Sequence, residues 1–364
     1  MLETFYAIID TISNPTYVLI GSPLALGAML RWRNELTKPK WALAFFALLT
    51  IGMGLAMTSD QFRKNTTTPD NIPILALMYL VPFFTWLALY KAVQNDIRLS
   101  KGLPTWEEET GRDEVYVWPD LVYTELISLM VCTVILIVWA IYLKAPLENP
   151  ANPADSPNPS KAPWYFLGLQ EMLVYFDPWI AGVVMPGLII VGLIAIPYVD
   201  FNPKGAGCYG FKHRPFSITM FLMGFVIFWV VLILIGTFLR GPNWNFFGPC
   251  EKWDVHKVEE LNNVDLSDYV WVNWLHTTKP AGSPGAILLR EAPGFAIVAF
   301  YFVVLPPLLA FTVFRSFYRK MGFIRYNVMI MLLLSWAMMV LKMAARWTFN
   351  LKYVVSIPEW FFNI

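Results

Sequence analysis

The chain has 364 residues, of which 57% are hydrophobic and only 15% are charged, and its mean hydropathy is +0.51. Soluble domains carry roughly a quarter charged residues, so this composition excludes a soluble enzyme with an ordinary surface. A net charge of +1 gives no electrostatic attraction for nucleic acid. The three cysteines never form a CxxC pair, which excludes a disulfide scaffold, a zinc ribbon and a CxxCH haem-attachment site. The composition therefore predicts a multi-pass membrane protein.

Hydrophobic stretches along the chain predict an all-α fold with about eight transmembrane helices. A bilayer core of about 30 Å needs roughly 20 apolar residues in helical form, because backbone polar groups must pair inside the segment. The first stretch is the weakest, since it is short and contains Asn14, Pro15 and Pro23. The predicted spans are approximately 14–30, 41–58, 72–90, 121–143, 179–199, 216–239, 294–314 and 326–343.

The distribution of lysine and arginine predicts the orientation of these spans. Basic residues gather in the connecting segments 31–40, 200–215 and 315–325, which the span count places on one side of the membrane. Because cytoplasmic loops carry the excess of lysine and arginine, these segments are expected inside. Both termini and the long segments 144–178 and 240–293 are then expected outside.

The three histidines, His213, His256 and His276, all fall in predicted loops. A b-type haem inside a membrane usually needs paired histidines that project from spanning helices. The sequence therefore predicts that this chain ligates no metal and no b haem of its own.

Residues 144–178 are the least ordinary part of the chain. Prolines crowd the stretch from Pro146 to Pro163, which excludes a helix and predicts an extended crossing of the outer surface. The apolar run from Trp164 to Phe176 then predicts a short helix, too short to span, that lies in the outer interface. Glu171 lies in this run, where an ionised carboxylate is costly unless it is paired. Such a group suits proton acceptance from a bound hydroquinone, and the alternative is that Glu171 simply extends to water.

This order of elements resembles the C-terminal half of cytochrome b, including subunit IV of cytochrome b6f complexes and its bacterial bc-type counterparts. The resemblance covers about 119–245, and the remaining helices at both ends are additions to it. The residues that carry it are Pro157-Asn158-Pro159, Ala162-Pro163-Trp164-Tyr165, Ile196-Pro197, Arg214-Pro215, Gly236-Thr237 and Leu239-Arg240-Gly241-Pro242-Asn243-Trp244.

In that family, the hydroquinone-oxidising pocket lies partly under a Pro-Glu-Trp-Tyr motif on the outer side. The resemblance places the family's acidic position on Pro163, so the proton must leave by another group, with Glu171, Tyr165 or Asp177 as candidates. Glu171 and Tyr165 are predicted as the catalytic residues. The predicted quinone-binding residues are Pro163, Trp164, Tyr165, Phe166, Leu169 and Glu171.

The resemblance implies a haem-free membrane subunit of a quinol:cytochrome c oxidoreductase that supports electron transfer coupled to proton release. It would act only within the complex, on a quinol of the menaquinone or ubiquinone type. Its expected partners are the haem-b-bearing N-terminal half of cytochrome b, and a Rieske-type iron–sulfur protein, a c-type cytochrome or both. The expected location is the bacterial cytoplasmic membrane.

The predicted organisation has four parts. A three-helix extension with an inner connector covers 1–118, the cytochrome b-like region covers 119–245, an outer loop covers 246–293, and a two-helix region covers 294–364. One alternative function is a haem-free quinone-binding anchor of another respiratory complex. A transporter is a weaker alternative, because the sequence shows neither matching halves nor an ionisable pair in the middle of a predicted span.

Overall fold

The computed structural model describes residues 2–111, 115–145, 147, 150–154, 156–202, 207–259 and 263–364. Within these residues helices predominate over loops. The strands form one small antiparallel sheet, in which β1 (Ser356–Ile357) pairs with β2 (Phe362–Asn363). The predicted all-α membrane fold is confirmed.

Seven helical stretches in the described part of the chain are long and apolar enough to cross a membrane. The first predicted span, 14–30, is also a helix, α2 (Pro15–Arg31), but it is not among the seven: it has 17 residues, one fewer than the shortest of them, and Pro23 lies inside it. The protein is therefore a multi-pass membrane protein, with seven candidate spans and α2 at the remaining predicted position. The seven candidate spans are Pro39–Ala56, Pro69–Ser100, Val117–Tyr142, Ile180–Val199, Pro215–Leu239, Pro284–Phe311 and Arg315–Phe349.

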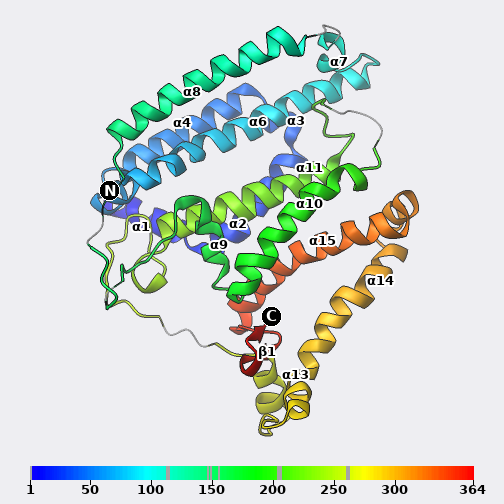
Figure 1. Ribbon diagram of the computed structural model, residues 1–364. Helices are drawn as coiled ribbons and strands as arrows, with labels where there is room; N and C mark the ends of the chain where they lie inside the picture. The colour runs from blue at the N-terminus through cyan, green and yellow to red at the C-terminus, as the bar shows by residue number, and fades with distance from the viewer. Residues whose placement is uncertain are drawn as a thin grey trace. The chain divides into compact units, whose positions relative to one another are not determined.

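The chain divides into two compact units. The first consists of Met1–Gly168 and Asn202–Val258. In it α4 and α6 run side by side (Figure 1). Its elements are α1 (Leu2–Ile12), α2, α3 (Arg33–Leu36), α4 (Pro39–Ala56), α5 (Asp60–Thr66), η1 (Pro69–Asn71), α6 (Ile72–Ser100), α7 (Trp106–Thr110), η2 (Val117–Leu121), α8 (Val122–Tyr142), η3 (Trp164–Phe166), the start of α9 (Leu167–Met172), α11 (Pro215–Leu222), η5 (Met223–Val231), α12 (Leu232–Leu234), η6 (Ile235–Leu239) and η7 (Pro242–Trp244).

A core cluster in this unit joins the N-terminal helices to the cytochrome b-like region. Ile74 of α6 is fully buried against Ile233 and Phe238, from α12 and η6. Phe62 of α5 stacks on Phe238 with ring centroids 6.2 Å apart. Burying a large apolar side chain contributes about 1.5–3 kcal/mol, so these contacts hold the N-terminal extension firmly to that region.

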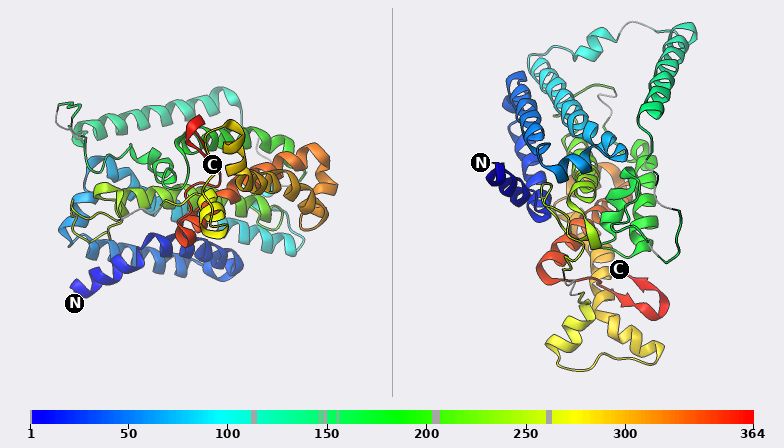
Figure 2. Two further views of the ribbon diagram at one scale, coloured as in Figure 1. Left: turned by 90° about the horizontal axis from the view of Figure 1, so that it is seen from below. Right: turned by 90° about the vertical axis from the view of Figure 1, so that its left-hand side faces the viewer.

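The second unit consists of Leu169–Phe201 and Glu259–Ile364. In it α10 packs along α15, and a methyl carbon of Leu332 would lie 3.8 Å from a Cβ placed on Gly192. The C-terminal hairpin is drawn in red in Figure 2. The elements are the rest of α9, η4 (Ile180–Val184), α10 (Met185–Val199), η8 (Asp268–Trp274), α13 (Pro284–Ala299), η9 (Phe300–Val304), α14 (Leu305–Phe311), α15 (Arg315–Phe349), β1, η10 (Pro358–Trp360) and β2.

Helix α13 begins at Pro284, earlier than the predicted span 294–314, and therefore includes Arg290 and Glu291. Both side chains are buried. The Arg290 Nε donates to Glu291 Oε1 at 2.9 Å, while its two terminal nitrogens donate to both carboxylate oxygens of Glu359 at 2.9 and 3.0 Å. Glu291 also accepts the backbone N–H of Ser356 at 2.9 Å. This pairing explains how charged residues lie inside a membrane-length helix.

The bidentate contact with Arg290 also holds the pKa of the exposed Glu359 well below its usual range, to about 2. Glu359 therefore stays ionised across the physiological pH range, and the contact is charge-assisted throughout.

We predict that Arg290→Met lowers the unfolding free energy of the second unit by about 3–5 kcal/mol, because Glu291 would remain buried without a cationic partner. Denaturant titration of the detergent-solubilised protein measures the change. The matched control is Arg319→Met, since Arg319 is exposed on α15, and it should change the free energy by less than about 0.5 kcal/mol. Equal effects of the two substitutions would contradict the assigned role of Arg290.

Candidate functional site

The predicted quinone-binding residues begin where the proline-rich segment meets a short helix. Pro163 is exposed and caps η3, with its carbonyl accepting the N–H of Phe166 at 2.9 Å. The rings of Trp164 and Tyr165 lie 5.6 Å apart, and those of Tyr165 and Phe166 lie 4.6 Å apart. Tyr165 and Phe166 are about half exposed, at 47% and 49%. The segment thus presents two accessible aromatic rings beside an anchored tryptophan.

Trp164 packs against helices from both sequence segments of the first unit, namely α6 and the α12–η6 stretch. It packs against the cluster of Ile74, Ile233 and Phe238, and Met78 of α6 packs there as well. Sequence reasoning missed Ile74 and Met78, because nothing distinguishes them from other apolar residues of a spanning helix. The N-terminal extension therefore contributes directly to the surroundings of the predicted site.

A buried carbonyl fixes the loop that precedes Trp164. The Lys161 ammonium donates to the carbonyl oxygen of Thr237 at 2.7 Å, and the Asn65 side-chain amide donates to the same oxygen at 3.2 Å. Lys161 also lies 5.2 Å from the ring of Trp253. A charge-assisted hydrogen bond to a buried acceptor is stronger than a neutral one, so the loop position is well defined.

The beginning of α9 approaches η6 closely at Gly236. A Cβ on Gly236 would lie 3.3 Å from both the Cβ and the carbonyl oxygen of Leu167, which is tighter than ordinary contact. At Gly168 the corresponding distances are 3.4 Å to Ile233 and 3.5 Å to Trp229, which is normal van der Waals contact. Gly236 is thus needed for the close approach.

The other two predicted quinone-binding residues lie in the second unit. Leu169 is half-buried and Glu171 is completely buried, with no exposed surface. The predicted alternative, in which Glu171 extends to water, does not describe this side chain.

Helix α9 ends at Met172, so the short helix is confirmed but ends before Phe176. Leu173 and Val174 donate to the carbonyls of Gln170 and Glu171, each at 3.2 Å, in turns that no longer follow the α-helical pattern. Tyr175 and Phe176 are buried. The chain turns here because these rings pack into the second unit instead of continuing along a surface helix.

Asp177, the third candidate proton acceptor, lies in a polar cluster of the second unit. Its carboxylate accepts the side-chain amide of Asn363 at 2.9 Å and is hydrogen-bonded to the Tyr353 hydroxyl. Burial, and then the neighbouring charge of Asp177, raise the pKa of Tyr353. Burial lowers the pKa of Lys352, whose charge interacts with that of Asp177. Asp177 is therefore already engaged as an acceptor.

All three histidines lie outside the seven candidate spans. Within the part of the chain that the structure describes, no cluster of three or more histidine, cysteine or acidic side chains could hold a metal ion.

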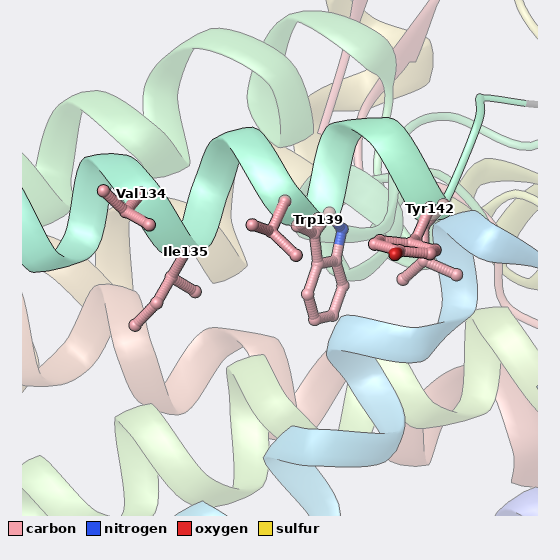
Figure 3. A pocket seen from close by; sticks show the side chains of 6 residues that line it. Val134, Ile135, Trp139 and Tyr142 are labelled. Carbon is pink, nitrogen blue, oxygen red and sulfur yellow. The ribbon is translucent and has the colours of Figure 1, made fainter.

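Helix α8 has no buried residue. One face of it carries an apolar hollow, in which Val134, Ile135, Trp139 and Tyr142 are labelled in Figure 3. Side chains of α8 itself and of Leu143, which directly follows it, line this hollow. This apolar surface is available to lipid or to another membrane protein.

These features define an all-α, multi-pass membrane protein whose proline-rich loop leads into a short aromatic helix. Residues 150–250 match the cytochrome b (C-terminal)/b6/petD family, which confirms the resemblance predicted for this part of the chain.

Two bacterial proteins are similar in sequence to part of this chain. Both are named menaquinol:cytochrome c reductase cytochrome c subunit. The protein of Geobacillus thermodenitrificans is 32% identical over 104 residues, which are 27% of this chain and 41% of the relative. That of Bacillus subtilis (strain 168) is 30% identical over 125 residues, which are 32% of this chain and 46% of the relative. The chain thus spans less than half the length of these relatives. No solved structure matches it.

We predict that Gly236→Ala disturbs the start of α9, whereas Gly168→Ala is tolerated. The added methyl at Gly236 meets the backbone of Leu167, and overpacking of this kind costs about 1–3 kcal/mol. Thermal unfolding of the two purified variants measures the difference. A Gly236→Ala variant as stable as Gly168→Ala would show that the close approach is not a constraint.

Proposed function

We propose that this chain is a haem-free membrane subunit of a bc-type quinol:cytochrome c oxidoreductase and forms part of its outer quinol-oxidation site. The observation that carries the proposal is the family match over residues 150–250, which includes the aromatic segment and Glu171. The names of the two relatives support a menaquinol or similar quinol as substrate.

The proposed chemistry is the removal of two electrons and two protons from a hydroquinone. One electron passes to an iron–sulfur or c-type centre and the other to b haems, all on partner subunits, while both protons leave on the outer side. Pro163, Trp164, Phe166 and Leu169 would line the binding site with apolar and aromatic surface, as is usual for small-molecule sites. Tyr165, with an exposed ring, would hydrogen-bond the quinol.

Glu171 is the proposed proton acceptor, because Pro163 occupies the family's acidic position and has no ionisable group. A carboxyl removed from water is suited to take a proton from a weakly acidic hydroxyl. Its complete burial on α9, directly after the aromatic segment, supports this assignment. Asp177 remains a second candidate, whose carboxylate accepts hydrogen bonds from Asn363 and Tyr353.

The proposed partners follow from what this chain offers to a complex. The position of every histidine outside the spans supports b-haem ligation by a separate cytochrome b N-terminal half. The uncovered apolar surface of α8 is suited to that subunit. A Rieske-type protein, a c-type cytochrome or both would accept electrons on the outer side.

The proposed location is the bacterial cytoplasmic membrane. Both termini are proposed to lie outside, which requires α2 to cross the bilayer in addition to the seven candidate spans. The bacterial origin of the relatives supports the first point. The lysine and arginine of segments 31–40, 200–215 and 315–325 support the orientation.

The first experiment is a dithionite-minus-ferricyanide difference spectrum of the complex purified through a tag on this chain. We predict a b-type α band together with a c-type band, because the haem-bearing subunits should remain attached. A complex without b haem would contradict the proposal and favour a quinone-binding anchor of another respiratory complex.

We further predict that Glu171→Gln lowers the rate of quinol oxidation by about 10²–10⁴-fold, the usual contribution of a general base. Turnover with a soluble quinol analogue and cytochrome c measures it, at unchanged b-haem content. Glu35→Gln is the matched control, since Glu35 is an exposed carboxylate on α3, and it should leave turnover unchanged. Normal turnover of Glu171→Gln would remove Glu171 from the mechanism.

A further inference from the structure

The C-terminal segment of the second unit contacts the stretch of chain that follows α9. The Lys352 ammonium donates to the carbonyl oxygens of Leu173 and Val174, at 3.3 and 3.1 Å. These carbonyls belong to the two residues that directly follow α9. Lys352 thus holds the chain at the point where it leaves the helix that carries Glu171.

Lys352 is itself held firmly in place. Its backbone N–H donates to the carbonyl of Val264 at 2.8 Å, and its own carbonyl accepts the ammonium of Lys342 at 2.6 Å. Its side chain also lies 5.4 Å from the ring of Tyr353. These three contacts restrict the motion of Lys352. Its ammonium group therefore restricts the positions of the two carbonyls that it binds.

A second set of contacts comes from the end of the C-terminal hairpin. The Asn363 side-chain amide donates to Asp177 at 2.9 Å, and the backbone carbonyl of Asn363 accepts the indole N–H of Trp179 at 3.0 Å. The ring of Trp179 also stacks on Phe362, with centroids 5.6 Å apart. The hairpin is anchored in turn by the two hydrogen bonds between Arg290 and Glu359.

We infer that Lys352 and Asn363 are positioning residues, which hold the stretch Leu173–Trp179 and thereby fix α9 with Glu171. This inference rests on the proposed function, because it assigns these contacts to quinol oxidation. Two separate points of attachment, one at each end of the stretch, restrict both its position and its rotation. Neither residue is placed in contact with the quinol.

The test uses the whole complex, purified from membranes, with the variants Lys352→Met, Lys352→Arg and Asn363→Leu. Hydrogen–deuterium exchange of peptides from 169–179 reports how firmly the stretch is held. We expect about tenfold faster exchange there in Lys352→Met, because the lost hydrogen bonds are charge-assisted. Lys352→Arg should restore slow exchange, since a guanidinium still donates to two carbonyls.

Turnover separates positioning from a merely structural contact. We expect kcat for quinol oxidation to fall about tenfold in Lys352→Met and less in Asn363→Leu, with unchanged KM and b-haem content, and to recover in Lys352→Arg. The matched control is Phe361→Asn, because Phe361 is 90% exposed in the same hairpin and asparagine tolerates its positive φ. It should change neither readout.

Each outcome decides the inference. Unchanged exchange in both Lys352→Met and Asn363→Leu would overturn it, and so would faster exchange with normal kcat. If Lys352→Met fails to assemble, Asn363→Leu supplies the same two measurements. If the unmodified complex does not oxidise quinol, the proposed function fails, whereas the exchange data still show whether these contacts hold the stretch.

Discussion

Inside a bilayer, polar groups of a protein must find their hydrogen-bond and ion-pair partners within the protein itself. The arrangement of this structure depends on that requirement. In the second unit, Arg290 and Glu291 lie inside a membrane-length helix because each is paired, within α13 and with the C-terminal hairpin. The hairpin residues that complete this pairing also bring Asn363 to Asp177. One electrostatic requirement near the start of α13 therefore places the chain end against the segment that follows α9.

The first unit solves the same problem with a backbone acceptor instead of an ion pair. The carbonyl of Thr237 receives donors from the proline-rich loop and from the segment after α4. The apolar cluster against which Trp164 packs includes Ile74 and also Phe238, the residue that follows Thr237. Both polar and apolar contacts thus join the N-terminal helices to the cytochrome b-like region. The N-terminal extension therefore packs against Trp164, one of the predicted quinone-binding residues.

Hydropathy alone predicted most of the fold. It found the membrane helices because an unbroken apolar run has few other stable structures. It misplaced the start of α13, because Arg290 and Glu291 count against a span unless their partner Glu359, far along the chain, is known. It also extended the helix after Trp164 through Phe176, since a run of apolar residues does not reveal that Tyr175 and Phe176 turn inward to be buried. Both errors come from long-range contacts.

The candidate site was predictable to the extent that it lies on one continuous segment. Trp164 and Tyr165 were predicted from a local motif, and Glu171 from its place in an apolar run. The family resemblance is confirmed over 150–250, and the roles of these residues stay predictions. The neighbours Ile74, Lys352 and Asn363 were not predictable, because each reaches the segment from a distant part of the chain and none belongs to a recognisable motif.

The shared carbonyl of Thr237 has a consequence for selectivity. A carbonyl oxygen offers two lone pairs, and the donors from Lys161 and Asn65 occupy both. A hydroxyl group of an incoming molecule finds no vacant acceptor there and would have to displace one of these donors. A ligand that binds beside Trp164 therefore gains no hydrogen bond from this oxygen, and its polar recognition would depend on other groups, such as the exposed Tyr165.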